Sequence, residues 1–170
     1  GKANPKVGLL NIGTEDSKGT PLQKEVYGLL QKAHDQGMIN FAGNVEAREL
    51  NAGACDVAVC DGFTGNIVLK LTEGVAKLMS GKIKKVFAGS FAGKLAYLLT
   101  RPAIKEFRAS MDYTEYGGAP ILGVSAPVIK AHGSSNAKAI KNAIRQAKAC
   151  VENDVVGAIR SAAKTAEENA

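Results

Sequence analysis

The chain has 170 residues, of which 45% are hydrophobic and 5% aromatic, and it carries a formal net charge of +6. This length suffices for one well-buried domain, with aliphatic side chains filling most of the core. No apolar stretch approaches the roughly 18–20 residues that a membrane-spanning helix needs, and residues 1–5 lack the apolar segment of a secretory signal. The sequence does not begin with Met, so we expect it to start partway into a longer polypeptide.

Short apolar runs in the first 60 residues predict three buried strands, at Val7–Ile12, Ile39–Ala42 and Val57–Cys60. Between the first two runs, Thr20 followed by Pro21 is typical of an N-cap and the first position of a helix. From Thr64 or Gly65 onward, apolar residues recur at helical spacing and predict a long helix. The first part of the chain therefore alternates between strands and helices.

Residues 81–111 interrupt this alternation and predict a protruding helical tip, broken at Gly89, Gly93 and Pro102. Strand character returns at Ala119–Val124 and Ala126–Ile129. A helix capped by Ser134 or Ser135 follows to about residue 151, and a last amphipathic helix includes residues 155–159. We predict one α/β domain over residues 1–170, with a mainly parallel sheet covered by helices on both faces.

Three of the predicted strands end in polar loops that contain glycine, and each loop opens a predicted helix. The loops comprise residues 13–19, 61–66 and 130–136. In an open α/β sheet, ligands bind outside the carboxyl ends of the strands. A helix N-terminus at that edge offers unpaired N–H groups and a partial positive charge. We therefore expect the three loops to converge on one site for an anion.

Lys18 could neutralise a phosphate oxygen as a point charge, or it could be a solvated loop lysine paired with Glu15. Asn66 could donate its amide to an oxyanion or a phosphate. The alternative for that loop is a tight turn between strand and helix, in which Asp61 and Thr64 only cap the helix.

His132 could protonate a leaving group near neutral pH, or it could form structural hydrogen bonds only. Lys18, Asn66 and His132 are thus the catalytic candidates. The residues predicted to bind phosphate or other groups of the substrate are Asn11, Gly13, Asp61, Gly62, Thr64, Gly65, Gly133, Ser134, Ser135 and Asn136.

The three cysteines, Cys55, Cys60 and Cys150, form neither an even set for disulfides nor a metal-ligand spacing. We accordingly predict a reduced, cytoplasmic protein with no metal site and no cofactor. Cys60 lies beside an apolar run, where cysteine usually acts as a small hydrophobic residue. Because it also precedes Asp61, a catalytic thiol remains the alternative.

The positive charge is concentrated between Lys77 and Lys105, a stretch without any acidic residue. Such a block, interleaved with apolar side chains, could lie on an anionic membrane surface or dock an acidic protein. A helical hairpin with a solvated lysine face, or a dimer contact, is the structural alternative. We do not expect nucleic acid, since no aromatic platform or recognition motif accompanies the charge. The tip residues predicted to make this contact are Lys84, Lys85, Phe87, Phe91, Lys94, Leu95, Leu98, Leu99 and Arg101.

Five segments of the sequence carry a family resemblance, and their order along the chain makes it specific. They are Pro5–Gly13 (PKVGLLNIG), Asn40–Glu46 (NFAGNVE), Asp61–Asn66 (DGFTGN), Tyr113–Ala119 (YTEYGGA) and Pro127–Asn136 (PVIKAHGSSN). Together they resemble the PlsX family of bacterial acyl-carrier-protein:phosphate acyltransferases. The resemblance runs over essentially the whole chain, yet it covers only the C-terminal half of the family pattern. The family's N-terminal Asp-Ala-Met-Gly-Gly-Asp motif and Gly-Asn-Thr-Gly loop are missing, so we expect a C-terminal part of a longer enzyme.

The resemblance implies a fold related to isocitrate dehydrogenase and phosphotransacetylase. It implies transfer of a long acyl chain from the thioester of acyl carrier protein to inorganic phosphate, which yields acyl phosphate for phospholipid synthesis. It further implies a cytoplasmic homodimer that associates peripherally with the membrane through its helical tip. Lys18 and Asn66 match the best catalytic candidates of the family pattern, and the segment from Phe91 to Leu99 matches the tip.

Two other functions remain open at this point. One is a phosphotransacetylase-like acyltransferase that uses coenzyme A, against which the basic, apolar tip argues, because a small thioester needs no docking surface. The other is a non-catalytic domain that binds membrane or carrier protein, which the missing N-terminal half favours. A dinucleotide oxidoreductase is disfavoured by the absence of a Gly-x-Gly-x-x-Gly loop after a strand.

Overall fold

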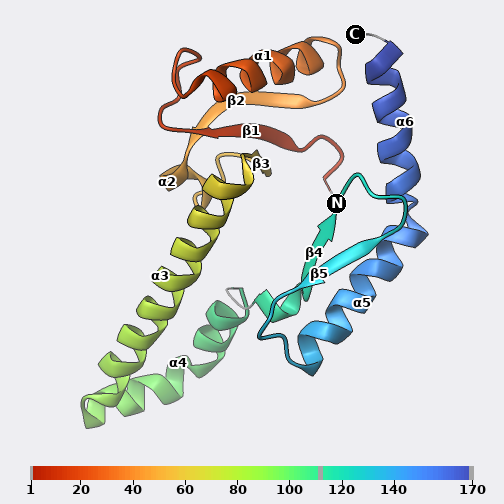
Figure 1. Cartoon of the computed structure of the whole chain (residues 1–170). Coiled ribbons are helices and arrows are strands. Elements are labelled where there is room, and N and C mark those ends of the chain that lie inside the picture. Colours follow the sequence, from red (N-terminus) through yellow and green to blue (C-terminus); the bar gives the residue numbers. More distant parts are fainter. Residues whose placement is uncertain (1, 111–112, 169–170) are drawn as a thin grey trace. The chain divides into compact units, whose positions relative to one another are not determined.

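The computed structural model describes residues 2–110 and 113–168, which form two compact units divided between Met79 and Ser80 (Figure 1). The helices and strands, in chain order, are β1 (Lys6–Asn11), α1 (Pro21–Asp35), β2 (Asn40–Glu46), α2 (Ala47–Leu50), β3 (Val57–Val59), α3 (Gly62–Ala88), α4 (Phe91–Ser110), a 3₁₀ turn (Tyr113–Glu115), β4 (Gly118–Ile121), β5 (Val128–Ala131), α5 (Ala137–Glu152) and α6 (Val155–Glu168).

The first unit is built on a parallel sheet of three strands in the order β2-β1-β3. Its core consists of Val7, Leu9 and Phe41, against which α1 packs its apolar side. From α1, Tyr27 meets Phe41 edge to face, with 5.2 Å between the ring centroids. The predicted fold class, a parallel sheet flanked by helices, is therefore confirmed. The relation to isocitrate dehydrogenase and phosphotransacetylase stays a prediction.

A β-bulge in β2 changes which side chains face α1. Val7 of β1 lies opposite Phe41, but Leu9 lies opposite Asn44, so β2 contains one additional residue between these pairs. The bulge includes Gly43, whose φ of +89° favours glycine. Because side chains alternate along a strand, the additional residue brings Asn44 to the sheet face that carries Leu9.

The second unit contains an antiparallel pair, β4 and β5, in which Gly118 lies opposite Ala131 and Ile121 opposite Val128. The two predicted strands in this part of the chain therefore form a separate sheet. The connection of residues 122–127 is too short for the crossover that a parallel pair needs, so the two strands form a hairpin. Helix α5 packs on the hairpin and buries Ala139, Asn142 and Ala143.

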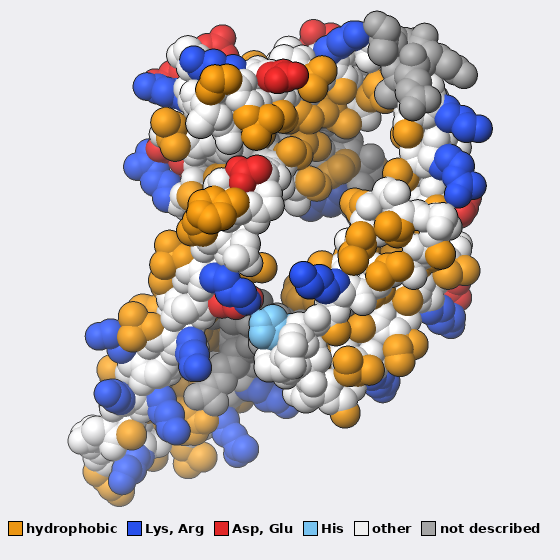
Figure 2. Space-filling model, viewed as in Figure 1, with side chains coloured by type: hydrophobic (Ala, Val, Ile, Leu, Met, Phe, Trp, Pro, Cys, Tyr) orange, Lys and Arg blue, Asp and Glu red, His pale blue; other side chains and the backbone are white. Residues whose placement is uncertain are grey.

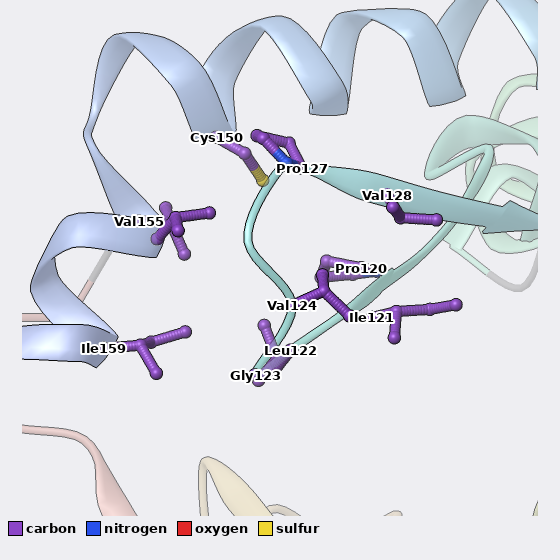
Figure 3. A pocket seen from close by; sticks show the side chains of 11 residues that line it. Pro120, Ile121, Leu122, Gly123, Val124, Pro127, Val128, Cys150, Val155 and Ile159 are labelled. Atoms are coloured by element: carbon purple, nitrogen blue, oxygen red, sulfur yellow. The ribbon is translucent and has the colours of Figure 1, made fainter. Parts of the chain in front are cut away.

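A small apolar cavity lies between the β4–β5 loop and the two C-terminal helices. Figure 3 shows Cys150 of α5 with Val155 and Ile159 of α6 facing the loop around Val124 and Pro127. Its volume of about 20 Å³ is close to that of one water-sized probe, so it is a packing void within the unit.

The helices over residues 62–110 are longer than predicted. Helix α3 continues to Ala88, and α4 runs without a break through Gly93 and Pro102, so the expected interruptions at these two residues are wrong. Gly93 lies in the first turn of α4, where its N–H donates to Ser90 Oγ at 3.0 Å and helps to begin the helix. Pro102 removes one helical hydrogen bond without ending α4. The chain leaves helical geometry only at Gly89 and Ser90.

Candidate active site

The loop after β1 is a compact turn that presents Lys18. Lys18 N donates to Glu15 O at 3.1 Å, and Asn11 Nδ2 donates to Lys18 O at 3.1 Å. The Lys18 side chain is 46% exposed, and its Nζ lies 3.8 Å from Glu15 Oε1. An exposed ion pair at this distance contributes little to stability, so the ammonium can exchange Glu15 for another anion at small cost.

Helix α1 begins directly after this loop, with Pro21 at its first position as predicted. Gln23 Oε1 accepts from Thr20 N at 3.1 Å, which completes the start of the helix. The preceding Gly19 has a φ of +93°, and a Cβ there would lie 2.7 Å from Asn11 Oδ1. Only glycine fits this position, so the loop and the helix start are fixed together.

The loop after β3 leads into α3, and Asp61 in this loop caps the start of that helix. Its carboxylate accepts from Thr64 N at 2.8 Å and from Thr64 Oγ1 at 2.6 Å. The side-chain hydrogen bond from Thr64, followed by the backbone bond, lowers the pKa of Asp61. The hydrogen bonds of this loop are those of a capped turn between strand and helix, as the alternative interpretation describes. Substrate contact stays a prediction for Asp61, Gly62, Thr64 and Gly65. Asn66 is the fifth residue of α3, just beyond its first turn, and is exposed.

These two loops lie at the same edge of the sheet, because β1 and β3 are neighbouring parallel strands. The start of α1 and the end of β3 border an open cavity of about 220 Å³. Its lining is apolar except for Gln23, Cys60 and Asp61 at the edge: the other residues are Leu9, Leu10, Leu22, Val26 and Val59. The structure thus brings the loops that carry Lys18 and Asn66 to one edge, as the strand order predicts.

Cys60 lies at the border of this cavity, next to Asp61. Desolvation, and then the charge of the Asp61 carboxylate, raise the pKa of the Cys60 thiol. The nucleophilic form of cysteine is the thiolate, which a raised pKa disfavours. A Cβ at Gly65 would come within 2.7 Å of the sulfur, so Cys60 packs closely against the start of α3. These observations favour a packing role over a catalytic thiol.

The third loop belongs to the second unit and precedes α5. His132 Nδ1 lies 2.7 Å from Ser134 Oγ and accepts from Ser134 N at 3.1 Å. The expected cap at Ser134 or Ser135 is wrong, because Asn136 has the extended backbone of an N-cap and its Oδ1 accepts from Ala139 N at 3.0 Å. Ser135 Oγ is buried and has no hydrogen-bond partner among the residues that the structure describes.

A Cβ at Gly133 would meet open space, so the backbone of this loop is accessible. The prediction that residues 130–136 share one site with the other two loops stays a prediction, as do the roles of His132, Gly133 and Ser134.

Sequence reasoning missed the contacts that hold α5. Three α5 side chains donate to successive carbonyls of the turn before β4. The bonds run from Asn142 Nδ2 to Thr114 O at 2.8 Å, from Arg145 to Glu115 O at 3.1 Å, and from Gln146 Nε2 to Tyr116 O at 2.8 Å. The segment 113–117 therefore has a structural role in placing the helix that opens at Asn136.

The predicted tip residues lie on α3 and α4, where lysines and apolar side chains intermingle, as Figure 2 shows for one face. Phe91 is 84% exposed, and Leu98 and Leu99 are also exposed. Phe87 and Tyr97 meet edge to face at 5.7 Å, and both line an open groove of about 390 Å³ with Lys84 and Lys94. The surface combines positive charge with exposed apolar area, and its partner stays a prediction.

Residues 2–110 and 113–168 contain neither a candidate membrane span nor a candidate metal centre. No helix in these ranges is both long and apolar enough to cross a membrane. Within the same ranges, no group of three or more His, Cys, Asp or Glu side chains is placed to hold a metal ion.

Comparison with known proteins places the chain in a family. The family model described as "Fatty acid synthesis protein" matches residues 1–158. The chain belongs to this family, and its resemblance to PlsX is thereby confirmed.

Curated relatives carry the name phosphate acyltransferase. Those of Brevibacillus brevis, Shouchella clausii and Clostridium perfringens are 52%, 51% and 54% identical to this chain over 155, 156 and 154 residues. These matches cover 91%, 92% and 91% of this chain but 45%, 46% and 44% of the relatives. The chain thus spans a little under half the length of the relatives that it matches.

Proposed function

We propose that the chain takes part in transferring a long fatty acyl group from acyl carrier protein to inorganic phosphate, with acyl phosphate as the product for phospholipid synthesis. The family and the names of its relatives support acyl transfer to phosphate. The observation that carries the proposal is the joint position of two helix-opening loops at one sheet edge, with a loosely paired Lys18 on one of them. Such an edge suits a small anion.

In the proposed reaction a phosphate oxygen attacks the thioester carbonyl, so that a carbon–oxygen bond forms and the carbon–sulfur bond breaks. The electron pair of the broken bond leaves with the carrier's thiolate. Between these events the carbonyl oxygen becomes an oxyanion close to a phosphate that is already negative. Fixed donors that match this charge lower the barrier more than they stabilise the bound substrate.

Lys18 is proposed to bind the phosphate, because its ammonium is partly exposed and only loosely paired with Glu15. Asn66 is proposed to donate its side-chain amide to the oxyanion or to phosphate, since it is exposed near the start of α3. Phosphate is a substrate here, and the proposal needs neither a metal nor a cofactor.

For the loop of the second unit, we propose that the Gly133–Asn136 backbone and the hydroxyls of Ser134 and Ser135 bind phosphate oxygens. The open space at Gly133 and the buried, unpartnered Ser135 Oγ, as far as the described residues go, support an anion there. His132 is proposed to protonate the departing thiolate.

The acidic acyl carrier protein and an anionic membrane surface are the proposed partners of the basic, apolar surface on α3 and α4. The exposed side chains of Phe91 and Leu99, and the lysines Lys84 and Lys94 that line the groove, support both. We further propose a cytoplasmic, peripherally membrane-associated homodimer, which light scattering after size exclusion would test.

The decisive experiment measures acyl phosphate formed by this chain, alone and mixed with the part of the Brevibacillus brevis relative that it does not match. Long-chain acyl carrier protein and acetyl-coenzyme A serve as competing donors. We expect phosphate-dependent turnover with the carrier-protein donor in the mixture. Turnover with acetyl-coenzyme A alone would instead identify a phosphotransacetylase-like enzyme.

Variants then test the two assigned side chains in the active mixture. Asn66→Ala should lower turnover about 10²–10³-fold if the amide stabilises the oxyanion. Lys18→Ala should raise the phosphate Michaelis constant, whereas Lys24→Ala, the same change on an exposed face of α1, should leave it unchanged. Equal phosphate kinetics in both lysine variants would remove Lys18 from the site.

A non-catalytic binding domain is the second candidate, favoured by the chain's share of its relatives' length. It predicts that the chain pellets with anionic liposomes or binds carrier protein while no mixture turns over substrate. Turnover in the mixture would exclude it.

A further inference from the structure

A pair of buried asparagines underlies the loop that carries Lys18. Asn11 on β1 and Asn44 on β2 are 9% and 6% exposed, and Asn11 Nδ2 donates to Asn44 Oδ1 at 3.1 Å. Asn11 Nδ2 also donates to Lys18 O, and Asn44 Nδ2 donates to Glu15 O at 2.6 Å. The two amides thus hold the backbone carbonyls at both ends of the Glu15–Lys18 turn.

The surrounding backbone is shaped to permit this pair. The bulge at Gly43 brings Asn44 to the same sheet face as Asn11, which a regular β2 would not do. At the other end of the loop, Gly19 approaches Asn11 so closely that any Cβ would collide with its amide. Gly43 and Gly19, both with positive φ, therefore give the backbone the shape that the asparagine pair needs. Pairing of β1 with β2 alone would not require a glycine at both positions.

Both hydrogens of the Asn11 amide are donated to protein atoms, and Asn11 Oδ1 accepts from Ile12 N at 2.9 Å. These hydrogen bonds support an effect of Asn11 on the loop, and its direct contact with phosphate stays a prediction. A buried amide that has lost its partner is costly, so the network favours one arrangement of the turn.

We propose that Asn11 and Asn44 are positioning residues, which fix the Glu15–Lys18 turn and thereby place the Lys18 ammonium at the carboxyl edge of the sheet. This inference rests on the proposed function only in naming phosphate as the anion that Lys18 meets. A role confined to holding β1 against β2 would leave the turn and Lys18 unaffected.

The first test is amide hydrogen exchange at Lys18 in the 170-residue chain. Asn44→Asp keeps the size of the side chain but replaces the donor to Glu15 O with an acceptor, and Asn11→Asp removes both donors. The control is Asn142→Asp, the same change at an asparagine that is 8% exposed and donates to Thr114 O in the second unit.

We expect exchange at Lys18 to become at least about tenfold faster in the first two variants and to stay unchanged in the control. Unchanged exchange in Asn11→Asp and Asn44→Asp would overturn the proposal. If Asn44→Asp does not fold, Asn44→Ala replaces it with the same expectation, since it removes both hydrogen bonds without burying a charge.

The second test titrates the chain with inorganic phosphate and follows the backbone amide of residue 18 by NMR. We expect Asn44→Asp to weaken phosphate binding about tenfold, and Lys18→Ala with Asn44→Asp to bind no more weakly than Lys18→Ala alone. Losses that multiply in the double variant would contradict positioning through Lys18. If the unaltered chain shows no saturable shift, the phosphate role of Lys18 fails, while the exchange measurement still decides whether the pair fixes the turn.

Discussion

Replacing Gly117 by Ala should destabilise the second unit more than a glycine-to-alanine change at any other loop glycine of that unit. Gly117 is buried with a φ of +85°, and a Cβ would overlap Ala143 N and lie 2.5 Å from Ala139 O. Left-handed backbone costs a non-glycine residue about 1–2 kcal/mol. Overlap with helix backbone, which cannot rotate away, adds about 1–3 kcal/mol. We expect a total loss of about 2–5 kcal/mol in the free energy of unfolding of this unit.

The matched control for this prediction is Gly123→Ala. Gly123 has a φ of +77°, but a Cβ there would meet nothing within 4 Å. Gly123→Ala should therefore cost only the free energy of placing alanine in left-handed backbone, about 1–2 kcal/mol. The hydrogen-exchange rate of α5 amides in urea is measured for both variants. Each 1.4 kcal/mol lost from the free energy of unfolding makes this exchange about tenfold faster. Equal exchange in the two variants would refute the claim that Gly117 is required by the close approach of α5.

Three further predictions use other parts of the chain. Asn136→Ala should destabilise α5 by about 1 kcal/mol through loss of its N-cap, measured as faster exchange in the first turn of that helix and not in α6. Hydrogen bonds from Thr64 lower the pKa of Asp61, so the cap that Asp61 forms on α3 should be complete above about pH 4 and lost as the pH falls through the lowered pKa. An NMR titration in which the Asp61 carboxyl has its midpoint at or above the ordinary pKa of about 3.9 would contradict this. Leu95→Glu should reduce pelleting with anionic liposomes, whereas Leu29→Glu, at a leucine on α1 that is at least as exposed, should not.

The strands and helix starts that sequence reasoning found share one property, which is that local patterns determine them. Val7–Leu10 is an apolar run whose residues are all buried, and Thr20 with Pro21 begins α1 as a cap and first residue do. The predicted strand Ile39–Ala42 ends before Gly43, whereas β2 continues through a bulge at Gly43 to Glu46. A glycine at that point indicates neither its φ nor a continuing strand, so Asn44 is not placed on the sheet by the sequence pattern and the asparagine pair stays hidden.

Errors at the other end of the chain have a similar physical origin. Ser134, Ser135 and Asn136 are all good cap residues, and only the backbone of the folded loop selects Asn136. The continuation of α4 through Pro102 shows the same limit, because local propensity argues for a break that the structure does not contain.

The polar residues predicted to meet substrate fall into two groups once their hydrogen bonds are known. Asn11, Asp61 and Asn136 direct their side chains inward, to the backbone of the loops that contain them. Among the described residues, the Asn66 side chain has no hydrogen-bond partner, and the Lys18 ammonium has only its loose pair with Glu15. We expect residues of the first group to act through loop structure, so that substituting them changes amide exchange as well as substrate binding. Substituting Lys18 or Asn66 should change phosphate binding or turnover without changing amide exchange in the loop, and a variant of either that also loosens its loop would place it in the first group.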